Sequence, residues 1–372
     1  MNYLLGAAAL CTATFVMLLG YFIRGAFKLR GMKPPPPPQA WPSVSVIVPL
    51  RNEEENAPET LQALASQAYP GPLEFILIND RSTDGTARLV DEMSRRDKRF
   101  QAVHIPNEAE IVPSPKKRAL TQGFARATGD ILMTTDADCL AGPLWVKTLA
   151  SYFAPGISIV QGPKRISGSG HWLHVYQEQE VFGLVSIEAA TFALGHPMIA
   201  SAPSLAYRRS LYEAVGGFQG IENSVSGDDD LLVRKMMRVP GAGVSYAPRA
   251  DACVSTGPVD KFWPLVIQRA RWASNGAHYD EKGFVALLIG LYGYYCWLCV
   301  SPILALGQCI PWWSCLGAWG VKFLCNGIFL GLTAKTLGQK KVLRRLIPCE
   351  LLHVPVVVLA VILGHFGLYR WK

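Results

Sequence analysis

Long apolar runs lie at both ends of the chain and frame a central part in which short apolar runs alternate with polar stretches. Residues 3–23 contain no charged side chain, and a helix needs about 20 such residues to cross about 30 Å of hydrocarbon. Further long runs cover residues 284–308, 310–333 and 347–368, with Lys322 inside the second of these three. The pattern predicts four membrane-spanning helices, one N-terminal and three C-terminal.

The charges around these runs predict the orientation of the protein. Residues 3–23 lack the positively charged start and the cleavage site of a secretory signal, so we expect a retained anchor. The positive-inside rule places residues 24–283 in the cytoplasm, while Arg370 and Lys372 argue mildly against it. We expect a multi-pass protein, in the inner or plasma membrane if the source is bacterial. The basic residues that decide this are Arg24, Lys28, Arg30, Lys33, Lys335, Lys340, Lys341, Arg344 and Arg345.

Composition supports a membrane protein and argues against nucleic acid as a partner. Hydrophobic residues make up 50% of the chain and charged residues 17%, against about 25% charged residues in typical soluble proteins. The formal net charge is +8, but much of the excess lies beside the apolar runs. Lys and Arg at such positions are attracted to an anionic membrane surface. We therefore expect the membrane, and no nucleic acid, as the partner of these charges.

The first half of the central part alternates predicted strands with predicted helices. Short apolar runs at residues 44–48, 75–78 and 131–133 are separated by helical patterns, which predicts an α/β fold with a mostly parallel, doubly wound sheet. Five prolines at residues 34–38 form an extended spacer in front of it. Ligands of such sheets bind beyond the carboxyl ends of the strands. Arg51, Asp80 and Asp136 are expected there.

The second half of the central part is irregular. Residues 157–161, 205–207 and 244–246 are predicted as short strands around a helix at residues 175–194. We expect this part to bind the acceptor, the second substrate of the site. The helix is apolar, but it is too short and has too many glutamates to span a membrane, and a core helix is favoured over one that lies in the membrane interface.

Asp136 and Asp138 are candidate metal ligands because they directly follow a predicted strand. In extended backbone, side chains two residues apart project to the same side. Two carboxylates about 4 Å apart repel each other by about 4 kcal/mol at an effective dielectric constant near 20. A hard ion such as Mg²⁺ or Mn²⁺ would remove that cost. A surface turn or a helix cap is the alternative for an isolated Asp-x-Asp.

Three further polar clusters are candidate site residues. Asp80 is placed to contact the nucleobase or the ribose of a nucleotide, whereas Asp84 or Ser82 fits a helix N-cap. The basic residues 116–118 either bind phosphate or form a solvated helix start. The three aspartates at residues 228–230 precede a predicted helix, whose dipole explains at least one of them. A carboxylate here could also act as a general base on an attacking hydroxyl group.

Gln268, Arg271 and Trp272 lie at i, i+3 and i+4 and therefore share one face of a helix, while Arg269 faces elsewhere. The guanidinium group of Arg271 could bind a diphosphate in bidentate fashion. The indole group could lie against a sugar ring or an acyl chain. The alternative is an aromatic belt at the membrane interface in front of the next span.

Taken in order, these motifs resemble those of the inverting family 2 glycosyltransferases with a GT-A fold. The resemblance extends over about residues 43–280, and its last motif is similar to that of ceramide glucosyltransferase-like enzymes and polysaccharide synthases. The motifs are residues 46–53 (VIVPLRNE), 79–86 (NDRSTDGT), 116–120 (KKRAL), 129–130 with 136–138, 206–208 with 216–218, 228–230, and 268–272 (QRARW).

The resemblance implies a role for each matching residue. Asp136 would approach the ribose or the metal, Asp138 would bind the metal, and Asp228 or Asp229 would be the base, with Asp229 favoured. Asn79, Arg81 and Asp228 depart from the usual Asp, Gly and Glu of the family, so the register of the acidic run stays open. The residues expected around the nucleotide-sugar are Pro49, Arg51, Glu53, Asp80, Lys116, Asp136, Gln268, Arg271 and Trp272.

The sequence thus predicts an anchor at residues 1–33, a linker at 34–42, a GT-A domain at 43–280 and a transmembrane region at 281–372. The expected reaction is metal-dependent transfer of a sugar, with inversion, from a nucleotide-diphospho-sugar to a lipid hydroxyl group. A UDP-sugar is the favoured donor. The alternatives are a processive polysaccharide synthase and, ranked lower, a nucleotidyltransferase or a catalytically silent membrane scaffold.

Overall fold

The computed structural model describes residues 2–106, 112–168 and 170–369 and divides into two compact units. One unit, called here the sheet unit, comprises Gly31–Ser167 and Ile187–Gly257. The other, called here the helical unit, comprises Met1–Arg30, Gly168–Ser186 and Pro258–Lys372. The boundary falls within one helix, α6 (Trp172–Leu194).

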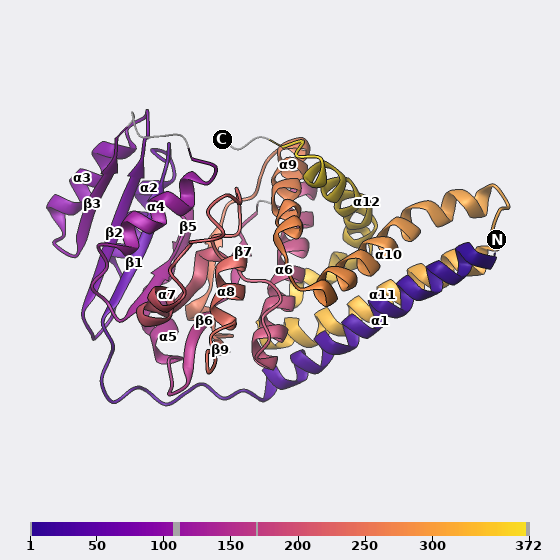
Figure 1. Cartoon of the computed structure of the whole chain (residues 1–372), viewed down its shortest axis with the longest axis horizontal. Coiled ribbons are helices and arrows are strands. Elements are labelled where there is room, and N and C mark those ends of the chain that lie inside the picture. Colours follow the sequence, from indigo (N-terminus) through magenta and orange to yellow (C-terminus); the bar gives the residue numbers. More distant parts are fainter. Residues whose placement is uncertain (1, 107–111, 169, 370–372) are drawn as a thin grey trace. The chain divides into compact units, whose positions relative to one another are not determined.

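The sheet unit contains a seven-stranded sheet in the order β3-β2-β1-β4-β8-β6-β9 (Figure 1). Its neighbouring strands are parallel except for β8, which is antiparallel to both β4 and β6. This confirms the mostly parallel sheet and adds β3, an edge strand missed in the sequence. The strands are β1 (Val44–Leu50), β2 (Leu73–Asp80), β3 (Phe100–Ile105), β4 (Ile131–Thr134), β6 (Ile157–Gln161), β8 (Leu205–Arg208) and β9 (Gly243–Tyr246).

A second, three-stranded sheet has the order β5-β10-β7. Each strand has three residues, which is too short to give a recognisable alternation of apolar and polar positions. This explains why the sequence did not predict them. The strands are β5 (Cys139–Ala141), β7 (Lys164–Ile166) and β10 (Val254–Thr256).

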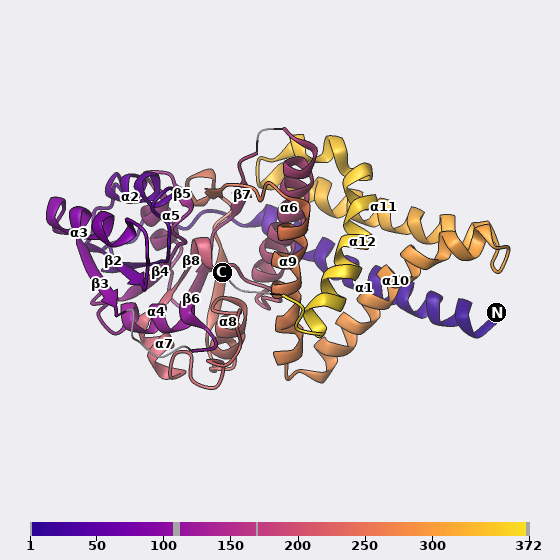
Figure 2. The same cartoon turned by 90° about the horizontal axis from the view of Figure 1, so that it is seen from above.

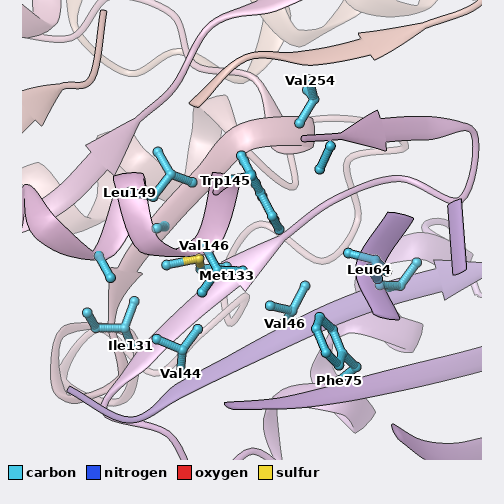
Figure 3. Close-up of a cluster of buried hydrophobic side chains, with 14 of the residues drawn as sticks. Val44, Val46, Leu64, Phe75, Ile131, Met133, Trp145, Val146, Leu149 and Val254 are labelled. Carbon is cyan, nitrogen blue, oxygen red and sulfur yellow. The ribbon is translucent and has the colours of Figure 1, made fainter. Parts of the chain in front are cut away.

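Helices cover the main sheet and fix the ends of its strands. Helix α4 packs closely on β1 and β2 at Gly123. A Cβ atom at this position would lie 2.7 Å from Cγ2 of Ile47 and 2.8 Å from Cδ1 of Ile78, so a larger residue would not fit. Elsewhere in the unit, Val46, Phe75 and other apolar side chains form a buried cluster (Figure 3). The helices are α2 (Ala57–Ala65), α3 (Thr86–Arg96), α4 (Pro115–Phe124), α5 (Trp145–Ser151), α7 (Arg209–Ala214) and α8 (Asp230–Met237), with 3-10 turns at Ala202–Ser204 and Ala250–Ala252.

The helical unit contains the long apolar segments (Figure 2). Among the described residues, four helical stretches are long and apolar enough to cross a membrane: Tyr3–Gly31, Lys282–Leu306, Trp312–Thr336 and Lys340–His365. They confirm the predicted set of one N-terminal and three C-terminal spans. The helices of this unit are α1 (Asn2–Gly31), α9 (Phe262–Ala273), α10 (Lys282–Leu306), α11 (Trp312–Thr336) and α12 (Leu346–His365), together with the first part of α6 and 3-10 turns at Ser274–His278 and Lys340–Arg345.

Aromatic and ionic contacts join these helices. The rings of Phe15 and Tyr294 stack with centroids 4.4 Å apart, which packs α1 against α10. The charge of Lys322, inside the predicted span, is matched by Glu350 of α12, whose Oε2 lies 2.8 Å from Nζ. Tyr295 of α10 is also within 3.2 Å of that ammonium group. Pairing of this kind is how charged residues are tolerated inside a membrane bundle.

Candidate active site

Asp80 is the last residue of β2 and lies at the carboxyl edge of the sheet, as predicted. Its side chain is buried, and its Oδ1 accepts hydrogen bonds from Nη2 of Arg118 at 2.7 Å and from Nε of Arg81 at 3.0 Å. Arg81 has a φ of 55°, in the left-handed region that favours glycine. The backbone therefore accounts for the glycine that the family usually has at this position.

The loops after β1 and β2 are tied to each other by side chains. Oδ1 of Asn52 accepts from the Thr83 amide at 2.8 Å, and Thr86 Oγ1 accepts from the Glu53 amide at 2.9 Å. Asp84 accepts from the Thr86 amide at 3.0 Å, but the N-cap of α3 is Gly85, so Asp84 lies one residue before the N-cap position expected for it. Pro49 lies in β1, and Arg51, which follows β1, is exposed.

Asp136 and Asp138 lie in a tight turn between β4 and β5, so the predicted extended backbone is wrong at this point. The Cys139 amide donates to the carbonyl of Asp136 at 3.2 Å and closes the turn. At this turn the chain leaves the main sheet and enters the small one. The turn nevertheless brings side chains together: one ligand atom each of Asp136, Asp138 and Cys139 lie within 4.8 Å of one another.

The protonation of this cluster suits a hard divalent ion. Partial desolvation, followed by repulsion from Asp136, raises the pKa of Asp138. Burial raises the pKa of Cys139 well above its usual range, so the thiol stays protonated and donates to Asp138 Oδ1 at 3.4 Å. The two carboxylates are therefore the groups that fit Mg²⁺ or Mn²⁺, which prefer oxygen ligands.

Lys116 connects the two acidic segments of the site. Its Nζ lies 2.8 Å from Oδ1 of Asp136 and 2.9 Å from Oδ2 of Asp228. Burial alone would lower the pKa of Lys116, but the two aspartates raise it above its ordinary value. The ammonium group is thus a fixed positive charge between the candidate metal ligands and the acidic run.

The three aspartates of the acidic run have different environments. Asp229 caps α8: its Oδ1 accepts from the Asp230 amide at 2.7 Å, and its Oδ2 accepts from the Ala202 amide at 2.9 Å. Burial and the charge of Asp228 raise the pKa of Asp229. Burial alone would also raise the pKa of Asp228, but Lys116 lowers it. Asp230 lies in the first turn of α8, where the helix dipole favours it.

Gly227 sets the direction in which the acidic run enters α8. Its φ is 82°, and a Cβ atom would lie 2.6 Å from Cγ of Leu231. We expect Gly227→Ala to destabilise the protein by about 1–3 kcal/mol, because both the backbone and the contact would be strained. The check is the thermal unfolding midpoint, with Gly142→Ala as control because nothing lies within 4 Å of a Cβ there. An unchanged midpoint for Gly227→Ala would contradict this account.

Lys117 holds the loop that precedes the acidic run, so it is neither a solvated residue at the helix start nor available for phosphate. Its Nζ donates to the carbonyls of Ile221, Ser224 and Ser226 at 2.6, 2.8 and 2.8 Å. The side chain is buried, and this desolvation lowers the pKa of Lys117 to about 8. Of the three cations, Lys116 therefore remains the candidate for phosphate.

We expect Lys117→Met to lower the free energy of unfolding by about 3–5 kcal/mol. The substitution keeps much of the volume but leaves three buried carbonyls without their charged donor. Differential scanning calorimetry of the detergent-solubilised protein measures the effect. Lys147→Met, at a lysine of α5, is the control for loss of a lysine charge. Equal midpoints for the two variants would show that Lys117 does not support the loop.

Gln268, Arg271 and Trp272 lie on α9, in the helical unit, and each is partly exposed. Arg269 is buried, as expected for a residue that faces elsewhere on the helix. The predicted GT-A region therefore includes residues that group with the apolar helices, namely Gly168–Ser186 and the start of Pro258–Lys372.

One buried carboxyl group near the acidic run was not singled out in the sequence. Glu188 of α6 is 2% exposed, and burial raises its pKa to about 7, although Lys164 acts in the opposite direction. Asp229 and Asp230 add repulsion. The available signal was a glutamate inside an otherwise apolar helical pattern, which indicates burial but not the neighbours that a fold supplies.

The sheet and the aspartates at its carboxyl edge define an α/β protein with a candidate divalent-cation site where ligands of such sheets bind. Comparison with known families specifies the class. Residues 45–216 match the family described as "Glycosyl transferase family 2", and residues 131–364 match "Glycosyl transferase family group 2". The chain belongs to the family 2 glycosyltransferases, enzymes that use nucleotide-sugar donors.

Curated relatives carry related names. An N-acetylglucosaminyltransferase of Rhizobium meliloti (strain 1021) is 28% identical over 302 residues, which is 74% of this chain and 68% of that protein. A beta-monoglucosyldiacylglycerol synthase of Synechocystis is 25% identical over 267 residues, covering 71% of this chain and 51% of that protein. An N-acetylglucosaminyltransferase of Mesorhizobium japonicum is 30% identical over 64% of this chain and 57% of its own length. The matches thus span about half to two thirds of these relatives.

The fold is shared with a solved structure. A mannosyltransferase from Pyrobaculum calidifontis, solved in complex with GDP-Man and Mn²⁺, has a TM-score of 0.65 at 21% sequence identity. The alignment covers 98% of this chain and 99% of that one. The similarity confirms the GT-A fold and the predicted combination of an α/β sheet with long apolar helices.

Proposed function

We propose that this glycosyltransferase moves a sugar from a nucleotide-diphospho-sugar to a lipid hydroxyl group, with inversion and with the help of a divalent cation. The observation that carries the proposal is the contact chain Asp136–Lys116–Asp228, with Asp138 and Asp229 at its two ends. Two candidate metal ligands, Asp136 and Asp138, and two candidate bases, Asp228 and Asp229, thus lie around one lysine. The lysine and a cation held by the first pair would supply positive charge for a diphosphate donor, and the second pair would supply a proton acceptor for a hydroxyl group.

The resemblance to the family assigns the donor-binding roles residue by residue. Pro49, Arg51, Glu53 and Asp80 would surround the nucleoside, and the resemblance favours a UDP-sugar. Lys116, once separated from Asp136, would contact phosphate. The α9 residues assigned to the diphosphate and the acceptor are Gln268, Arg271 and Trp272.

In the proposed mechanism Asp229 is the general base. Its carboxylate takes the proton of the acceptor hydroxyl group as the oxygen attacks the anomeric carbon. The bond from that carbon to the diphosphate oxygen breaks, and the electron pair leaves with the nucleoside diphosphate. Asp228 is the weaker base because Lys116 already matches its charge. A divalent ion held by Asp136 and Asp138 would neutralise the leaving diphosphate.

A lipid acceptor is favoured over a growing polysaccharide by the way α9 meets the first C-terminal span. Helix α9 ends at Ala273 and α10 begins at Lys282, joined by one 3-10 turn. Processive synthases usually have a gating segment after the Arg-Trp helix and additional spans. The name of the Synechocystis relative, a synthase of a glucosylated diacylglycerol, supports the same acceptor class.

The test is transfer of label from a panel of radiolabelled UDP- and GDP-sugars by membranes that contain the wild type. We expect label in the organic extract when Mn²⁺ or Mg²⁺ is present. Label that stays in insoluble polymer would support a polysaccharide synthase. Pyrophosphate release would support a nucleotidyltransferase, and release of neither product would support a silent scaffold.

We propose that the sheet unit faces the cytoplasm. The uncharged connection between α10 and α11 should then lie on the other side, and it contains the exposed thiol of Cys309. A membrane-impermeant maleimide is expected to label intact cells that produce the wild type but not Cys309→Ser. Labelling of Cys309 only after permeabilisation would reverse the proposed orientation.

A further inference from the structure

Arg269 makes a buried, bidentate ion pair that the proposed function does not use. The residue lies on α9 and is 6% exposed. Its Nε lies 3.0 Å from each carboxylate oxygen of Glu180, and its Nη2 lies 2.6 Å from Oε2. Glu180 belongs to α6 and is itself buried. A bidentate pair of this kind fixes the guanidinium plane as well as its position.

The same guanidinium group contacts two residues of the Gln-x-x-Arg-Trp motif. Nη1 of Arg269 donates a hydrogen bond to Oε1 of Gln268. Cζ of Arg269 lies 4.3 Å from the centroid of the Trp272 ring, which is within the range of a cation–π interaction. One buried cation therefore orients both an amide and an indole that are partly exposed.

Helix α6 provides a firm support for Glu180. Gln177 Nε2 donates to the Val259 carbonyl at 2.8 Å, and the Val259 amide donates back to Gln177 Oε1 at 2.9 Å. Three residues earlier, Nε2 of His174 lies 3.0 Å from Oδ1 of Asp260. Positions 174, 177 and 180 are spaced by three and share one face of the helix. This face binds both the segment that enters α9 and the arginine within α9.

We propose that Glu180 and Arg269 are positioning residues, which set the orientation of Gln268 and Trp272 for the acceptor. The inference rests on the proposed function of those two motif residues. A buried ion pair is weak grounds for a stabilising role, since an apolar replacement is often as stable. The contacts to Gln268 and Trp272 give the pair a different purpose.

The experiment compares three changes in the full-length, detergent-solubilised protein. Glu180→Gln removes the carboxylate but keeps the shape. The exchange Glu180→Arg with Arg269→Glu restores opposite charges but takes the guanidinium group away from Trp272. Glu350→Gln is the matched control, because it removes the carboxylate of another buried pair of the helical unit, the one with Lys322.

We expect Glu180→Gln to reduce kcat about 10–100-fold, in line with the cost of misplacing a group by about 1 Å. The exchange should recover the thermal midpoint without recovering kcat. Glu350→Gln should lower the midpoint and leave kcat near that of the wild type. Recovery of kcat by the exchange, or an equal loss of kcat in Glu350→Gln, would overturn the proposal.

A second measurement does not depend on turnover. The emission of Trp272 is obtained by subtracting the spectrum of a Trp272→Phe derivative from that of each protein. Glu180→Gln should shift this difference spectrum, and Glu350→Gln should not. An unchanged spectrum in Glu180→Gln would refute positioning even if the wild type were inactive, whereas an inactive wild type with a shifted spectrum would refute only the proposed function.

Discussion

Asp138→Ala is expected to reduce sugar transfer by about a thousandfold or more, which corresponds to about 4 kcal/mol of transition-state stabilisation. The substitution removes one of the two carboxylates that fit a divalent ion, while Asp136 remains paired with Lys116. The side chain is exposed and lies in a turn, so its loss should not disturb the core. Removal of one of two repelling carboxylates should even leave the metal-free protein slightly more stable.

Two measurements separate loss of metal binding from loss of folding. The first is transfer of labelled sugar into the organic extract, in Mn²⁺ and in EDTA. The second is the thermal midpoint with and without Mn²⁺. At 100 times its Kd, Mn²⁺ should stabilise the folded wild type by about 2.7 kcal/mol and so raise its midpoint, and it should stabilise Asp138→Ala far less. Asp251→Ala, at an exposed aspartate of a 3-10 turn, is the control. Equal stabilisation of both variants by Mn²⁺ would rule out Asp138 as a ligand.

Asp229→Asn is expected to reduce kcat by about 10²–10⁴-fold, the usual contribution of a general base. Asparagine is a good N-cap, and its Oδ1 can still accept from the Asp230 amide, so α8 should remain folded. Its amide nitrogen cannot accept from the Ala202 amide as Oδ2 of Asp229 does, so the thermal midpoint should fall by a few degrees, and activity is measured well below that midpoint. Steady-state kinetics with donor and acceptor varied separately will show whether the change lies in kcat.

Asp228→Asn is the matched comparison, since it lies one residue away and also removes one negative charge. The substitution removes one partner of Lys116. We therefore expect a smaller loss of activity than in Asp229→Asn, partly as a change in the KM of the donor. The reverse result, with Asp228→Asn nearly inactive and Asp229→Asn active, would assign the base to Asp228. That result would also decide how the acidic run, residues 228–230, aligns with the family motif, which has a Glu where this chain has Asp228.

The parts of the fold that could be predicted are those with long or strongly apolar patterns. Strands β1, β2 and β4 and the four spans depend on local composition, and the structure differs from the predicted ranges mainly at their ends. Strand β3, at the edge of the sheet, has no regular alternation of buried and exposed positions, and β5, β7 and β10 have three residues each. Their existence depends on pairing partners far away in the chain, which a local pattern cannot show.

The candidate site shows the same division between local and distant information. Asp80 ends β2 and Asp136 lies two residues after β4, so topology alone placed them. Lys116 and Lys117 are adjacent, and consecutive residues of a helix point in directions about 100° apart, so one of them had to face away. Which one did was decided by the loop at residues 221–226, more than a hundred positions later. Glu180 was equally out of reach for an argument about α9, because it lies 89 positions before Arg269.

The pair formed by Lys322 and Glu350 has a consequence for biogenesis. A lone lysine or acidic residue at the centre of a nascent span costs about 2.5–3.5 kcal/mol at the translocon. Helices α11 and α12 each carry one of the two charges, so insertion of either helix alone would bring an unpaired charge into the bilayer. Entry of both into the bilayer as a hairpin would let the charges cancel before either meets lipid.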